Sequence, residues 1–121
     1  MIDIGVNLTN SRFDRDRSSV IARAVSHGIT GMLVTGTSVE VSRQAIALCQ
    51  AHPDYLRCTV GIHPHDADRV DDDYLQQLAD LAGNAWVKAI GECGLDFNRN
   101  FSAPAQQLRI FAEQVQLAQQ L

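Results

Sequence analysis

The sequence has few cysteines and no long apolar run, and each of these shortages excludes a class of protein. The three cysteines, Cys49, Cys58 and Cys93, are an odd number without C-x-x-C spacing, so they form no disulfide framework and fit a reducing compartment. No stretch approaches the roughly 20 apolar residues of a membrane span, and Met1 leads directly into Ile2–Val6 without a signal peptide. The sequence therefore predicts a cytoplasmic protein that makes no membrane contact.

Positive charge is also scarce. Ten basic side chains stand against fourteen acidic ones, which gives a formal net charge of -4. This balance provides no global positive field for a nucleic acid, so any such contact must be local. A chain of 121 residues, of which 45% are hydrophobic, has enough apolar material for one domain with a core.

Short apolar runs alternate with segments of helical spacing along the whole chain. The predicted strands are residues 2–6, 31–35, 55–62 and 85–91. The predicted helices are residues 19–27, 38–52, 71–83 and a last one that starts near Pro104. This order predicts an α/β fold of four βα units with a parallel sheet.

The last helix has the clearest periodicity in the chain. Its apolar positions are Leu108, Phe111, Ala112, Val115, Ala118 and Leu121, and their spacings of three and four predict an apolar stripe that needs a partner. Ser102-Ala103-Pro104 is a plausible start, but no residue near Leu121 stops the helix, so we expect the chain to end inside it. The acidic run between Asp66 and Asp73 is expected to cap the helix over 71–83.

Polar residues follow every predicted strand. They are Asn7, Thr35-Gly36-Thr37, His63-Pro64-His65-Asp66 and Glu92-Cys93-Gly94-Leu95-Asp96. The carboxyl ends of parallel strands lie at one rim of a sheet, where α/β proteins bind their ligands. The pattern therefore predicts a functional site at this rim.

Two parts of the rim have alternative interpretations. In an extended segment His63 and His65 project to the same side and could chelate Zn or Fe, or they could be solvated or paired with a carboxylate. Glu92 emerges where a buried strand leaves the core and needs a counter-charge. A metal ion, Arg99 or backbone N–H groups could supply it.

Three motifs bear a family resemblance in order and at compatible spacing. Residues 1–8 (MIDIGVNL), 61–66 (GIHPHD) and 89–97 (AIGECGLDF) resemble the TatD-type metal-dependent hydrolases. The resemblance covers the whole chain and implies a magnesium-dependent nuclease on a TIM barrel. Most of that family ends its first strand in a metal-binding His-x-His, whereas this chain has Gly5 and Asn7 at those positions.

The resemblance also implies roles for the rim residues. Glu92 matches the family's bridging metal carboxylate, and His63 and His65 match histidines near the scissile phosphate. Asp96 is expected to orient the turn after the fourth strand, with a catalytic role as the alternative, and Asn7 is a possible rim contact. The cofactor implied is a divalent metal, Mg²⁺ foremost, with Mn²⁺ or Zn²⁺ as alternatives.

The activity that the resemblance implies is 3'-5' exonuclease hydrolysis of phosphodiester bonds in single-stranded DNA or RNA, with a role in DNA repair. The family's remaining metal-binding histidines and its catalytic aspartate follow later strands, and a complete (β/α)₈ barrel takes roughly 250 residues. We therefore expect residues 1–121 to be the N-terminal half of such a barrel, a single partial domain that is inactive alone.

Two alternatives compete with this enzyme segment. One is a non-catalytic half barrel that self-associates or pairs with a separate second half. The other is a doubly wound domain that binds a small phosphate ligand, although the chain lacks a G-x-G-x-x-G motif. A half barrel would leave both edge strands open and expose Ile2, Ile4, Val34 and Val87, which favours a homodimer.

Overall fold

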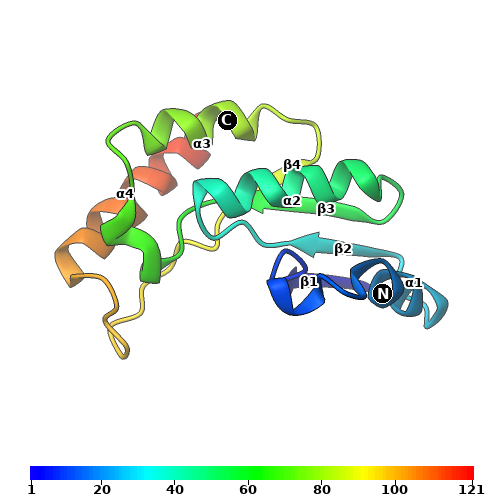
Figure 1. The fold of residues 1–121 in the computed structure, drawn as a ribbon. Coiled ribbons are helices and arrows are strands. Elements are labelled where there is room, and N and C mark those ends of the chain that lie inside the picture. The colour runs from blue at the N-terminus through cyan, green and yellow to red at the C-terminus, as the bar shows by residue number, and fades with distance from the viewer.

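The computed structural model describes residues 1–121, and it contains one parallel sheet (Figure 1). The strands β1 to β4 lie side by side in sequence order, β1-β2-β3-β4. Their bounds are β1 Ile2–Val6, β2 Gly31–Val34, β3 Leu56–Val60 and β4 Val87–Ile90. The predicted four βα units are confirmed; β1 has the predicted bounds, and β2, β3 and β4 are shorter than the apolar runs that predicted them.

Helices alternate with these strands, and none of them is long and apolar enough to cross a lipid bilayer. The α-helices are α1 Arg17–Ser26, α2 Val39–Ala51, α3 Tyr74–Ala82 and α4 Pro104–Gln120. Two short 3₁₀ helices were not predicted, η1 Ser11–Phe13 and η2 Pro64–Arg69. The helices α2 and α3 contact β3, and α3 and α4 contact β4.

The core lies between the sheet and its helices. Alternate residues of β2 and β3 point into it, including Val34, Leu56 and Cys58, which are fully buried. They pack with apolar side chains of the helices such as Ile46 of α2 and Leu78 of α3. One face of each central strand is therefore committed to the helix layer, because successive side chains of a strand point to opposite sides.

The other face of the sheet is open. Ile2 and Ile4 of β1 are 67% and 73% exposed, as predicted for residues that would point into a barrel. The prediction was wrong for Val34, which is 0% exposed. Val34 pairs with Cys58 in the register of β2 and β3, so it shares the helix-facing side. Val87 also lies on that side, half-buried beside Cys58.

Helix α4 leaves much of its apolar stripe without a partner, as expected for a half barrel. Leu108, Val115 and Leu121 are exposed, whereas the buried positions are Gln107, Ile110, Gln114 and Leu117. The glutamines are buried because the backbone satisfies them: the Gln114 amide nitrogen donates to the carbonyl oxygens of Ile62 and Ile110, each at 3.2 Å. Its oxygen accepts from the Ile62 N–H at 2.7 Å. The face of α4 that packs on the core therefore combines two hydrogen-bonded glutamines with Ile110 and Leu117.

The expected helix caps are also different in the structure. Asp73 precedes α3 without a side-chain cap, and its carboxylate accepts from the Gln77 side chain instead. Asp68 accepts from the backbone N–H of Ala103 at 2.9 Å, which lies at the start of α4. The acidic run therefore links η2 to α4 through space instead of capping α3.

Candidate active site

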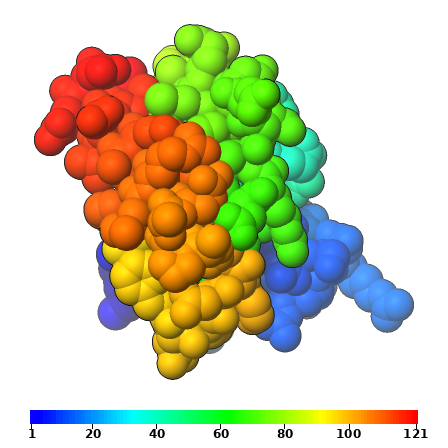
Figure 2. All heavy atoms as spheres, turned by 90° about the vertical axis from the view of Figure 1, so that its left-hand side faces the viewer, coloured from blue at the N-terminus to red at the C-terminus, as the bar shows by residue number.

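The loop after β3 places both predicted histidines at the carboxyl-end rim, the end of the molecule seen in Figure 2. His63 is extended, but Pro64 starts η2 at once, so the expected extended His-x-His segment was wrong. The backbone N–H of His65 donates to Nδ1 of His63 at 3.1 Å, which leaves the ring proton of His63 on Nε2. The two rings meet edge to face with centroids 4.3 Å apart.

Glu92 faces His63 from the end of β4. Its Oε1 lies 3.6 Å from Nε2 of His63, and the carboxylate is 60% exposed. The backbone after β3 can lie close to the backbone after β4 only because residue 61 is glycine. A Cβ added to Gly61 would come within 2.9 Å of the Gly91 backbone. Burial lowers the pKa of His63 below its ordinary value, and the Glu92 carboxylate opposes this shift. His63 is therefore neutral at pH 7 and presents an N–H to the rim.

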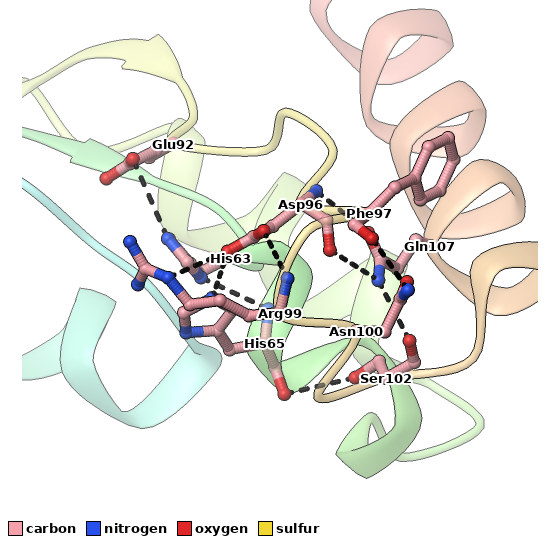
Figure 3. Close-up of polar contacts among 9 residues, drawn as sticks. All are labelled: His63, His65, Glu92, Asp96, Phe97, Arg99, Asn100, Ser102 and Gln107. Carbon is pink, nitrogen blue, oxygen red and sulfur yellow. Dashed lines mark hydrogen bonds and ion pairs between the residues drawn. The ribbon is translucent and has the colours of Figure 1, made fainter.

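Asp96 holds His65, as Figure 3 shows. Its Oδ2 lies 2.6 Å from Nε2 of His65, and its Oδ1 accepts from the backbone N–H of Arg99 at 3.0 Å. The hydrogen bond to His65, followed by the one from Arg99, lowers the pKa of Asp96 below its ordinary value. The structure places Asp96 at the turn after β4, where the sequence predicts it to orient the backbone.

A lowered pKa has a testable consequence for Asp96. We expect its carboxyl carbon, followed by NMR, to titrate below the ordinary aspartate value near 4, and His65→Ala to raise the midpoint. Because the folded-state pKa is the lower one, the pairing stabilises the fold above the unfolded-state pKa and is lost as the pH falls through the folded value. An unchanged midpoint in His65→Ala would contradict the pairing.

Two residues that sequence reasoning missed hold this loop in place. Gln107 of α4, buried, accepts from the Asp96 N–H at 3.0 Å and donates to the Ser102 carbonyl at 2.8 Å. The hydroxyl of Ser102 donates to the His65 carbonyl at 3.0 Å. The signal available was the spacing of Gln107, Ile110, Gln114 and Leu117, a helical period that includes two glutamines. A search for apolar residues at helical spacing does not detect a buried face that includes glutamines.

Two hollows flank the His63–Glu92 pair. The first, of about 350 Å³, also contains Asn7, Thr37 and His65 in its lining. The second, of about 400 Å³, lies against the β4–α4 loop, which is yellow to gold in Figure 2. All five predicted site residues, Asn7, His63, His65, Glu92 and Asp96, thus line one or the other hollow.

The described residues supply only part of a metal site. No group of three or more His, Cys, Asp and Glu side chains is arranged to hold a metal ion. Glu92 is the one carboxylate that both hollows share, and its Oε1 lies 3.6 Å from Nε2 of His63. A cation with several protein ligands would need donors beyond these two.

The chain belongs to the family of TatD related DNases, which it matches over residues 2–121. Hydrolases of this family depend on a metal ion. The chain is 55% identical over 118 residues to the 3'-5' ssDNA/RNA exonuclease TatD of Dickeya dadantii, covering 98% of this chain and 45% of that protein. It is 52% identical over 121 residues to the protein of the same name from Pectobacterium parmentieri, covering 46% of it.

Solved structures agree with this assignment. A TatD homolog from Escherichia coli superimposes with a TM-score of 0.88 at 27% identity, over 99% of this chain and 47% of that one. A TatD family hydrolase from Entamoeba histolytica gives 0.91 at 28% identity, over 99% and 46%. The chain spans about half the length of the relatives it matches, so its four βα units correspond to about half of a TIM barrel. Nothing in these comparisons supports the non-catalytic module.

Proposed function

We propose that residues 1–121, a single partial domain, supply the first half of a metal-dependent nuclease that removes nucleotides from the 3' end of single-stranded DNA or RNA. The relatives that carry this name support the activity. The observation that carries the proposal is the convergence of His63–Glu92 and His65–Asp96 on one rim. We also propose Mg²⁺ as the cation, with Mn²⁺ or Zn²⁺ as alternatives, a cytoplasmic location and a role in DNA repair.

Each rim residue has a separate task in this proposal. The exposed Glu92 carboxylate would supply an oxygen ligand to a hard divalent cation such as Mg²⁺. In metal-dependent hydrolases a bound cation polarises the phosphate and activates water. His63 donates its Nε2 proton in a hydrogen bond to a phosphate oxygen. Asp96 orients the His65 ring through Nε2, so the Nδ1 atom of His65 is the one left to contact the substrate or move a proton.

A composite barrel tests the proposal directly. It consists of residues 1–121 in place of the matching segment of the Dickeya dadantii relative. We expect Mg²⁺-dependent release of nucleotides from the 3' end of a labelled single-stranded oligonucleotide, and loss of release with a chelator. Circular dichroism checks that the composite folds. A folded composite that leaves single strands intact, or degrades them only from the 5' end, would contradict the proposal.

We further propose that the 121-residue chain by itself forms a homodimer, or pairs with a second half. Ile2 and Ile4 are exposed on the sheet face, and Leu108, Val115 and Leu121 are exposed on α4. Strands β1 and β4 each have one unpaired edge. Such surfaces favour association, and the rim has no group of three His, Cys, Asp or Glu side chains that could hold a metal ion by itself.

The expected result for the isolated chain is therefore self-association without cleavage. Light scattering after size exclusion should give about twice the 13.3 kDa of one chain, and single-stranded DNA with Mg²⁺ should stay intact. A monodisperse monomer whose β1 and β4 amides resist hydrogen exchange would contradict the association. Cleavage that Glu92→Gln abolishes would instead show that a second copy completes the site.

A further inference from the structure

The second hollow differs from the first in one respect that bears on substrate binding. Both hollows include His63 and Glu92 in their linings, so they adjoin at this pair. The first is lined by amides and hydroxyls such as Asn7 and Thr37. The second contains Arg99, the only side chain in either lining with a permanent positive charge. Together the two hollows also contain the carboxylates Asp66, Glu92 and Asp96.

Most of the Arg99 guanidinium is free to bind a ligand. Its Nε lies 3.5 Å from Asp96 Oδ2, and the side chain is 61% exposed. No other carboxylate lies within ion-pair distance of it, so its two terminal nitrogens carry no partner. Arg99 and His63, both labelled in Figure 3, line the second hollow.

The loop that carries Arg99 is held in place before any ligand binds. The Arg99 N–H donates to Asp96 Oδ1 at 3.0 Å, and the Asn100 N–H donates to the Asp96 carbonyl at 3.1 Å. The Asn100 side chain donates to the Phe97 carbonyl at 2.7 Å, and Gln107 fixes the Asp96 backbone from α4. A cation on a preorganised loop loses less conformational entropy when it binds.

We propose that Arg99 binds a backbone phosphate of the nucleotide adjacent to the scissile bond, in the hollow between η2 and the β4–α4 loop. This inference rests on the proposed nuclease function and names the ligand as a phosphodiester of a single strand. A guanidinium presents a planar fork of donors that matches phosphate oxygens. Three carboxylates line the two hollows, so this cation offsets local repulsion of a polyanion. A hollow of about 400 Å³ has the size of small-ligand pockets.

The test is the salt dependence of binding by the composite barrel. Arg99→Gln keeps the backbone hydrogen bond to Asp96 and removes the charge. For a single strand, each phosphate contact contributes about 0.7 to the slope of log affinity against log salt. Fluorescence anisotropy with labelled oligothymidylate in a chelator should show the slope falling by about 0.7 and affinity falling about tenfold. Arg99→Lys should retain the slope, because the charge remains.

Arg109→Gln is the matched control. Arg109 lies on α4, is half exposed and pairs with Glu113, so its loss should change neither slope nor affinity. A composite that cleaves normally while Arg99→Gln keeps both values would overturn this inference and leave the proposed function intact. A slower Arg99→Gln variant with an unchanged slope would also overturn it, because Arg99 would then act only through Asp96. A folded parent composite that neither binds nor cleaves would overturn the proposed function itself.

Discussion

Glu92→Gln is expected to lower turnover of the composite barrel about a hundredfold, a typical loss when a charge-stabilising group is removed from an active site. Glutamine keeps the shape of the side chain and removes the negative charge that faces His63 at 3.6 Å. We expect it to weaken binding of Mg²⁺ or Mn²⁺ more than any other single change in these 121 residues. Calorimetry of metal binding and steady-state kinetics measure the two effects separately.

The control for this experiment is Glu40→Gln. Glu40 is exposed in the first turn of α2 and accepts a hydrogen bond from Gln44. The substitution therefore removes one negative charge at a position outside the His63–Glu92 pair. Metal affinity and turnover should stay near those of the parent. If Glu92→Gln left the metal affinity unchanged, Glu92 would not be a metal ligand. The expectation that Glu92 needs a counter-charge was wrong, because its carboxylate is 60% exposed and water can solvate it.

Gln114→Leu is expected to lower the free energy of unfolding by about 2 to 4 kcal/mol. Gln114 is fully buried and makes hydrogen bonds to both the N–H and the carbonyl of Ile62. Leucine fills a similar volume but leaves these two backbone groups without partners inside the core. Urea denaturation of the composite barrel, monitored by circular dichroism, measures the change.

This substitution should also affect the site, because Ile62 directly precedes His63. We expect lower turnover in Gln114→Leu even under conditions where the variant stays folded. Gln116→Leu, at an exposed position of the same helix, should change stability by no more than about 0.5 kcal/mol. A loss below about 1 kcal/mol in Gln114→Leu would mean that water or a rearranged loop satisfies Ile62.

The scarcity of basic residues is compatible with a nucleic-acid substrate if the few positive charges lie next to the bound strand. The two hollows contain one guanidinium, Arg99, among three carboxylates, and a bound divalent cation would add further positive charge at the scissile phosphate. We therefore expect weak non-specific binding away from the rim. Specific contact then depends on the few groups that the strand ends bring together.

The sequence alone was sufficient to predict the fold class and to predict which polar residues lie at the carboxyl-end rim of the sheet. Alternating strand and helix patterns are local, and parallel strands in sequence order bring their carboxyl ends to one edge. This rule placed Asn7, His63, His65, Glu92 and Asp96 at one rim before any distance was known. Their roles rest on the family resemblance and stay predictions that the variants above test.

Tertiary structure decided which groups pair across that rim and which face of α4 is buried. His65 and Asp96 are 31 residues apart in sequence, and nothing in the spacing of either loop relates one to the other. Hydrophobic periodicity identified the apolar stripe of α4, with Leu108 and Val115, but not the buried positions Gln107 and Gln114. Burial of a polar side chain depends on backbone partners in other segments, here at Asp96, Ser102 and Ile62. A pattern within one helix cannot contain those partners, because they exist only when the chain has folded.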